Sequence, residues 1–177
     1  SEIEEIEKRI EDLARELKEL NKEVEERVKK LIEDLRRLNE ESRESTDRLM
    51  DELRKAGAPR EELEEMIKRL KRLNDENTRH SEEVMDTARR LIERNKEHTE
   101  RVIRRIEELL EKLRRSDKDE VVRRVLEEIE RLVRRDKEHT ERVLRTIEKL
   151  VREDEEHTKR VNEEIRKLAK EIEERAR

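Results

Sequence analysis

All four histidines of the chain lie in one repeated pattern, in which an asparagine or aspartate precedes the histidine by three residues and a hydroxyl residue follows it. The copies are NTRHS at 77–81, NKEHT at 95–99, DKEHT at 136–140 and DEEHT at 154–158. Imidazole, carboxylate, amide and hydroxyl groups together can transfer protons, bind a metal or form a hydrogen-bond network. Which of these they do depends on the elements that hold them.

Metal binding is the first candidate chemistry. The DKEH and DEEH segments have the spacing of the Glu-x-x-His motif of di-iron helical bundles, but that site collects four carboxylates. Here the facing segments offer Asn95 and Asn77, so each site would contain one carboxylate. We therefore expect no metal site and no cofactor.

Catalysis is the second candidate chemistry. Ser45 or Ser81 could approach a histidine that Asp154 orients. A narrow helical bundle, however, has no substrate pocket, and its backbone N–H groups are already bonded within helices and cannot stabilise an oxyanion. We expect no catalytic residue, no small-molecule substrate and no enzymatic activity.

The composition excludes several other classes of protein. Charged residues make up 57% and apolar residues 29% of the 177 residues, which suits helices with a thin apolar stripe. The 48 basic and 53 acidic residues are mixed along the chain, and aromatic residues are lacking, so we expect no nucleic-acid binding. No segment reads as a membrane span or a signal peptide, and there is no cysteine. We expect a soluble protein without a natural location, cytoplasmic when expressed.

Two short breaks divide the chain. Gly57 suits the position after a helix, and Pro59 suits the first turn of the next one. At the second break, Ser116 or Asp117 can cap the next helix, and Asp117 with Glu120 fits a capping box, as Ser1 with Glu4 does at the start. These signals predict helices at about 2–56, 59–115 and 117–176.

The apolar residues of each predicted helix follow one face, in a stripe about 140° wide. Short loops make neighbouring helices antiparallel, so we expect an all-α, up-down-up three-helix bundle that forms a single domain over 1–177. His80 and His98 are eighteen residues apart, as are His139 and His157. Eighteen residues are five whole turns, which favours nearly straight helices about 80 Å long and an elongated bundle.

The same repeat places the polar residues in two layers. Asparagines and aspartates lie near the middle of the apolar stripes, and the histidines lie at the edges. The buried asparagines and aspartates need hydrogen-bond partners, which the histidines and threonines can supply. One predicted layer contains Ser42, Thr46, Asn77, His80, Ser81, Asp154, His157 and Thr158, with Asn39 and Asn74 nearby. The other contains Asn95, His98, Thr99, Asp136, His139 and Thr140, with Asn21, Val24 and Val28 as neighbours from the first helix.

Three near-equal helices, single Gly and Pro residues and polar layers such as NKEHT and DKEHT resemble de novo designed helical bundles with modular buried hydrogen-bond networks. The resemblance covers the whole chain and implies a structural scaffold or assembly module. It leaves open that the chain is a subunit of a homo- or hetero-oligomeric bundle, with itself or a designed helix or chain as partner. It also leaves open a histidine-based pH switch, for which we expect Asp136 to raise the pKa of His139.

Overall fold

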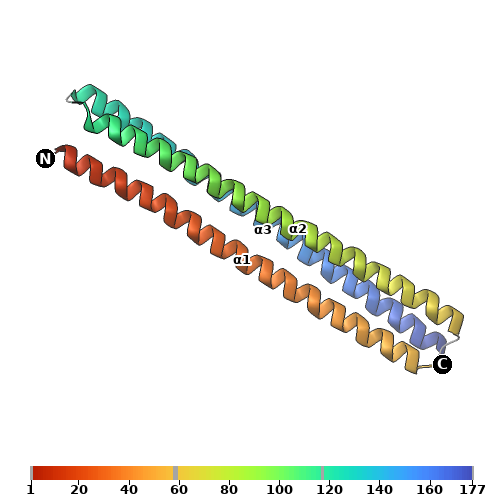
Figure 1. Cartoon of the computed structure of the whole chain (residues 1–177). Helices are drawn as coiled ribbons and strands as arrows, with labels where there is room; N and C mark the ends of the chain where they lie inside the picture. Colours follow the sequence, from red (N-terminus) through yellow and green to blue (C-terminus); the bar gives the residue numbers. More distant parts are fainter. Residues whose placement is uncertain (1, 58–59, 117, 177) are drawn as a thin grey trace. The chain divides into compact units, whose positions relative to one another are not determined.

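The computed structural model describes residues 2–57, 60–116 and 118–176. They form three α-helices, α1 (Glu2–Lys55), α2 (Arg60–Arg114) and α3 (Asp119–Ala176) (Figure 1). The described residues contain no strand, and the helices pack on one another. The prediction of an all-α three-helix bundle is confirmed.

The first loop begins as the sequence predicts. The backbone N–H of Ala56 still donates to the carbonyl of Glu52 at 3.1 Å, and Gly57 then adopts a φ of 73°. This left-handed conformation ends α1, because residues of a right-handed helix have negative φ. Glycine adopts it readily, since it has no side chain to be strained. The helix therefore ends at Lys55, one residue before the expected end. Pro59 lies outside the described residues.

The start of α3 differs from the prediction by two residues. The carbonyl of Lys118 accepts the backbone N–H groups of Val121 and Val122, which are the first bonds of the helix, so Asp119 is its first residue. The hydroxyl of Ser116 accepts the backbone N–H of Lys118 at 3.4 Å. Ser116 is one of the two predicted caps of this helix; the other, Asp117, and the predicted cap Ser1 lie outside the described residues.

The chain divides into two compact units, and each helix contributes to both. The first unit contains Ser1–Lys29 and Ala88–Ile147, and the second contains Lys30–Thr87 and Glu148–Arg177. The single domain, the elongated shape and the straight helices remain predictions.

In the first unit α1 and α3 run parallel. Arg9 pairs with Glu130, and Glu16 pairs with Lys137. In each pair the two partners are 121 residues apart in sequence, so the two helices advance in the same direction. α2 runs in the opposite direction. Its end at Arg114 contacts Glu7 of α1.

The second unit has the same topology. Ser42 of α1 hydrogen-bonds Asn162 of α3, 120 residues later, which matches the parallel offset of the first unit. Asn77 of α2 contacts Thr158, whereas His80 contacts Asp154, so α2 and α3 run antiparallel. The up-down-up order holds within each unit.

Each unit has its own apolar core. In the first, the core cluster contains the buried side chains Ile10, Leu17, Ile103, Ile106, Leu109, Leu110, Leu113, Val125, Ile129 and Val133. In the second, the core cluster contains Leu53, Leu63, Leu70, Val161, Ile165, Ala169 and Ile172. Among the described residues Ile3, at 41% exposure, is the only exposed large hydrophobic side chain. None of the described helices contains a stretch long and apolar enough to cross a membrane.

Candidate functional site

In the first unit, Asp136 of α3 is surrounded by donors from α2. Its side chain is 1% exposed. One carboxylate oxygen lies 2.7 Å from Nδ1 of His98, and the other accepts the hydroxyl of Thr99, also at 2.7 Å. Because His98 and Thr99 are adjacent in sequence, one turn of α2 supplies both donors.

Asn95 of α2 has the matching arrangement with α3. Its Oδ1 lies 2.9 Å from Nδ1 of His139, and its side-chain amide also contacts the hydroxyl of Thr140. The NH₂ group donates to Oδ1 of Asn21 on α1 at 2.9 Å. The layer therefore joins all three helices through the side chain of Asn95.

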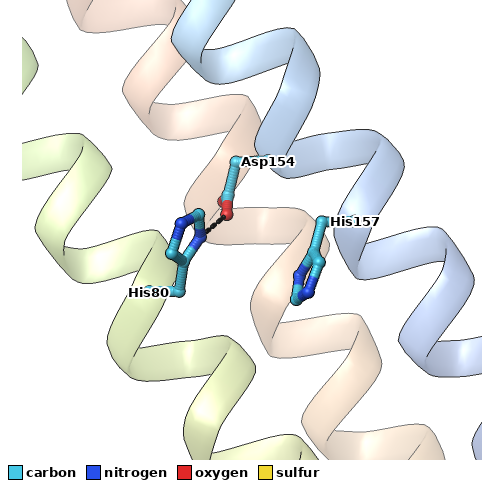
Figure 2. Close-up of side chains that lie close together, drawn as sticks. All are labelled: His80, Asp154 and His157. Atoms are coloured by element: carbon cyan, nitrogen blue, oxygen red, sulfur yellow. Dashed lines mark hydrogen bonds and ion pairs between the residues drawn. The ribbon is translucent and has the colours of Figure 1, made fainter.

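The second unit repeats this arrangement. Asp154 of α3 is buried, with Oδ1 2.5 Å from Nδ1 of His80 and Oδ2 2.5 Å from the hydroxyl of Ser81. Figure 2 shows the rings of His80, from α2, and His157, from α3, on either side of the Asp154 side chain.

Asn77 of α2 corresponds to Asn95. Its Oδ1 lies 2.9 Å from Nδ1 of His157, and its amide contacts the hydroxyl of Thr158. Its NH₂ group also lies 3.4 Å from Oδ1 of Asn39 on α1. The same residue types at the same spacing therefore make the same bonds in both units.

These contacts fix the proton on each imidazole. A carboxylate accepts hydrogen bonds and cannot donate them, so Nδ1 of His80 and His98 must carry the proton. The Asn77 and Asn95 amides donate to α1 through their NH₂ groups, so their oxygens face the imidazoles and accept. All four neutral histidines are thus protonated at Nδ1, with the lone pair on Nε2.

The predicted layer residues of α1 behave differently from those of α2 and α3. Thr46 is 2% exposed, but its hydroxyl donates to the backbone carbonyl of Ser42 in its own helix at 2.8 Å. Ser42 does bond across helices, to Oδ1 of Asn162 at 2.5 Å and to Asn74 at 3.4 Å. Thr46 is therefore buried in the layer, and this hydrogen bond stays within α1.

Asn21, Asn39 and Asn74, which the sequence placed beside the layers, form hydrogen bonds within them, and the structure adds Asn162. A sequence signal existed for Asn21 and Asn39, which lie eighteen residues apart on the apolar face of α1. Asn162 lies outside the repeated pattern, and only the packing of α3 against α1 identifies it. Among the described residues, no buried side-chain nitrogen or oxygen lacks a hydrogen-bond partner.

The histidines lie at the edges of the layers, as the helical wheel predicts. The side chain of His80 is 53% exposed and that of His98 is 40% exposed, whereas their carboxylate partners are buried. The rings of His98 and His139 lie side by side, with centroids 4.6 Å apart and a tilt of 32°. The corresponding centroids of His80 and His157 are 5.5 Å apart.

The expected rise in the pKa of His139 is wrong. Burial lowers its pKa below the ordinary value of 6.5, and the positive charges of His98 and Arg142 lower it further. Asp136 acts in the raising direction, but its effect is smaller than that of burial and of His98, and its oxygens bond His98 and Thr99. His139 contacts the neutral amide of Asn95.

Comparison of the chain with protein-family models, with curated proteins and with solved structures found no match.

Proposed function

We propose that the chain is a designed structural scaffold or assembly module whose two polar layers fix the register of its three helices. The observation that carries the proposal is the reciprocal pairing between α2 and α3. Asn95 binds the His-Thr pair of α3, while Asp136 binds the His-Thr pair of α2. Each motif is therefore both acceptor and donor, in both units.

Reciprocal pairing disfavours other registers. If α3 moved by one turn relative to α2, Asp136 and Asn95 would leave their donors and be buried without partners. A buried polar group without a hydrogen bond costs about 1–3 kcal/mol. Leucine and isoleucine that recur along a stripe lose much less in such a shift, so apolar packing alone specifies register poorly.

The test removes the layers and keeps the apolar bundle. The variant replaces Asn77, Asn95, Asp136 and Asp154 with leucine, Ser81 with alanine, and Thr99, Thr140 and Thr158 with valine. We expect thermal stability to stay the same or rise, because well-packed apolar residues often match buried polar groups. Uniqueness should be lost, which light scattering would detect as mixed oligomers and NMR as extra or broadened amide signals.

A matched control is available in Thr146 of α3. Its side chain is exposed, and its hydroxyl donates to the carbonyl of Arg142 in the same helix. Thr146→Val therefore repeats the chemical change outside the layers and should leave a single species. A layer-free variant that remains one species with one set of signals would refute the register function.

A second candidate function is a pH-responsive switch in the first unit. It is favoured by the rings of His98 and His139, whose centroids are 4.6 Å apart beside the one carboxylate of Asp136. Two imidazolium groups at this distance repel each other, and one carboxylate cannot neutralise both. Acid would then loosen the layer between α2 and α3. Amide hydrogen exchange around Asn95 should speed up at pH 5 if this function is correct.

A further inference from the structure

Three potential metal ligands meet at the edge of the layer in the second unit. One ring nitrogen of His80, one of His157 and one carboxylate oxygen of Asp154 all lie within 4.8 Å of one another (Figure 2). We propose that these side chains bind a divalent first-row transition-metal ion such as Zn²⁺. This site is independent of the register function proposed above.

The donor set suits this class of ion. Imidazole nitrogen and carboxylate oxygen bind Zn²⁺ at about 2.0–2.2 Å, and sites with three protein ligands keep a further position for water. Imidazole also suits Cu²⁺ and Ni²⁺, whereas Mg²⁺ and Ca²⁺ prefer oxygen ligands. Two nitrogens and one oxygen therefore select a transition metal.

The site is open to solvent on one side. Side chains around His80 and His157 line a surface groove of about 450 Å³. Its charged lining residues are Glu76, Glu83 and Glu164, against Arg79 and Arg160. The groove is thus slightly acidic, which favours the approach of a cation. Water can complete the coordination of an ion held there.

Asp154 gives a physical reason for an ion to bind. Its side chain is 0% exposed, and the neighbouring His80 carries a positive charge only when its imidazole is protonated. Buried charges are normally paired or bound to metals, since an isolated charge is costly to remove from water. A divalent ion would supply positive charge beside Asp154 while both histidines stay neutral.

Binding requires a small local rearrangement. Nδ1 of His80 now donates to Asp154 across 2.5 Å, so a metal at this nitrogen takes the place of that proton. Water can carry the proton to Nε2, because neutral imidazole exists with the proton on either nitrogen. His157 can keep the bond from Nδ1 to Asn77 and offer its Nε2 lone pair, while the hydroxyl of Ser81 holds the buried carboxylate of Asp154.

The proposal departs from the expectation of no metal site. That expectation counted carboxylates against a di-iron centre, whereas the structure brings together a mixed set of one carboxylate and two imidazoles. His80 belongs to α2 and Asp154 to α3, so their pairing was not visible in the spacing within either segment.

The first unit supplies an internal control. His98, Asp136 and His139 are the same residue types in the equivalent positions, but their rings lie closer and more nearly parallel. Within the described part of the chain, only the His80 group gathers three ligand atoms of this kind within 4.8 Å. The two layers therefore differ in the spacing of their potential metal ligands, although the ligands are of the same residue types.

The experiment is a calorimetric titration of the full chain, without a histidine tag, with Zn²⁺ at pH 7.5. We expect one saturable site per chain. His80→Asn and His157→Asn should each weaken binding by about tenfold or more, since loss of an outer-shell partner alone costs roughly 10–100-fold. His98→Asn and His139→Asn, the matched controls, should change affinity by no more than about twofold. All four histidines lie at the bundle surface, and circular dichroism would verify that each variant is folded.

A second measurement assigns the ligands directly. Substoichiometric Cu²⁺, which is paramagnetic, should broaden the imidazole signals of His80 and His157 before those of His98 and His139. The proposal is overturned if Zn²⁺ shows no saturable site, if His80→Asn binds as tightly as the parent chain, or if the first-unit variants lose the site instead. None of these results bears on the register function, which is tested without metal.

Discussion

Nδ1 of His139 lies 2.9 Å from Oδ1 of Asn95 on the facing helix, and the His139 ring packs against that of His98 with centroids 4.6 Å apart. His139 is half-buried, so its protonation would place a positive charge next to a second imidazole and a neutral amide. The layer therefore favours neutral His139.

This arrangement predicts an acid-sensitive first unit. Since the folded pKa of His139 lies below the unfolded value of about 6.5, the unfolded chain binds the proton first as pH falls. Stability contributed by neutral His139 is present above pH 6.5 and decreases from there toward the folded pKa. An NMR titration of His139 should give a midpoint below 6.5. In urea denaturation, His139→Gln should lose less stability between pH 7.5 and 5 than the parent; an identical loss would contradict the role of His139.

Removal of one partner from the first layer should destabilise the protein more than removal of both. Asp136→Leu leaves the hydroxyl of Thr99, which is 3% exposed, without its acceptor and should cost about 1–3 kcal/mol. Adding Thr99→Val should recover part of that loss, because the unpaired hydroxyl is gone. Urea denaturation of the two single variants and the double variant measures the coupling. Additive losses would show that the pair does not interact.

The ion pair between Glu16 and Lys137 should hold the pKa of Glu16 down. Their hydrogen bond at 2.8 Å, followed by the charge of Lys137, lowers the pKa of the Glu16 carboxyl below the ordinary 4.5. Its contribution to stability is present above pH 4.5 and is lost as pH falls through the folded pKa. Lys137→Met should raise the Glu16 pKa in a carboxyl NMR titration. Lys29→Met, which removes the pair with Glu25 instead, should leave Glu16 unchanged.

Gly57 should resist replacement for backbone reasons alone. Its φ is 73°, and a Cβ built there meets no atom within 4 Å. Gly57→Ala should therefore destabilise the protein by about 1–2 kcal/mol through conformational strain rather than collision. Gly57→Asn should be milder, since asparagine tolerates the left-handed region better. Denaturation midpoints that fall equally for both variants would point to a different cause.

The chain should be monomeric in dilute solution. Ile3 is the only exposed large hydrophobic side chain among the described residues, so little apolar surface remains for another helix to cover. Light scattering should give a mass near 21.8 kDa at neutral pH. A stable dimer or larger species would favour the alternative in which the chain is a subunit of a designed oligomer.

Much of the fold could be predicted from the sequence alone, because its signals are local. Apolar residues with helical spacing require three helices, and Gly57 stops the first one whatever lies around it. The helix bounds moved by no more than two residues: α1 ends at Lys55 instead of 56, α2 spans Arg60–Arg114 instead of 59–115, and α3 begins at Asp119 instead of 117. The polar layers were also visible, because asparagine and aspartate interrupt an otherwise apolar face at a fixed interval.

The partners within each layer were decided by tertiary structure. Asp136 and His139 are three residues apart on one helix and could have paired locally, yet each bonds the facing helix instead. Side chains that project from the same stripe point toward the neighbouring helix, so the shortest contacts cross between helices. The relative register of α2 and α3 sets those contacts, and no spacing within one helix encodes it. The sequence placed His80, Asp154 and His157 in one layer, but the distances between their ligand atoms and the bond between Ser42 and Asn162 appear only in the folded chain.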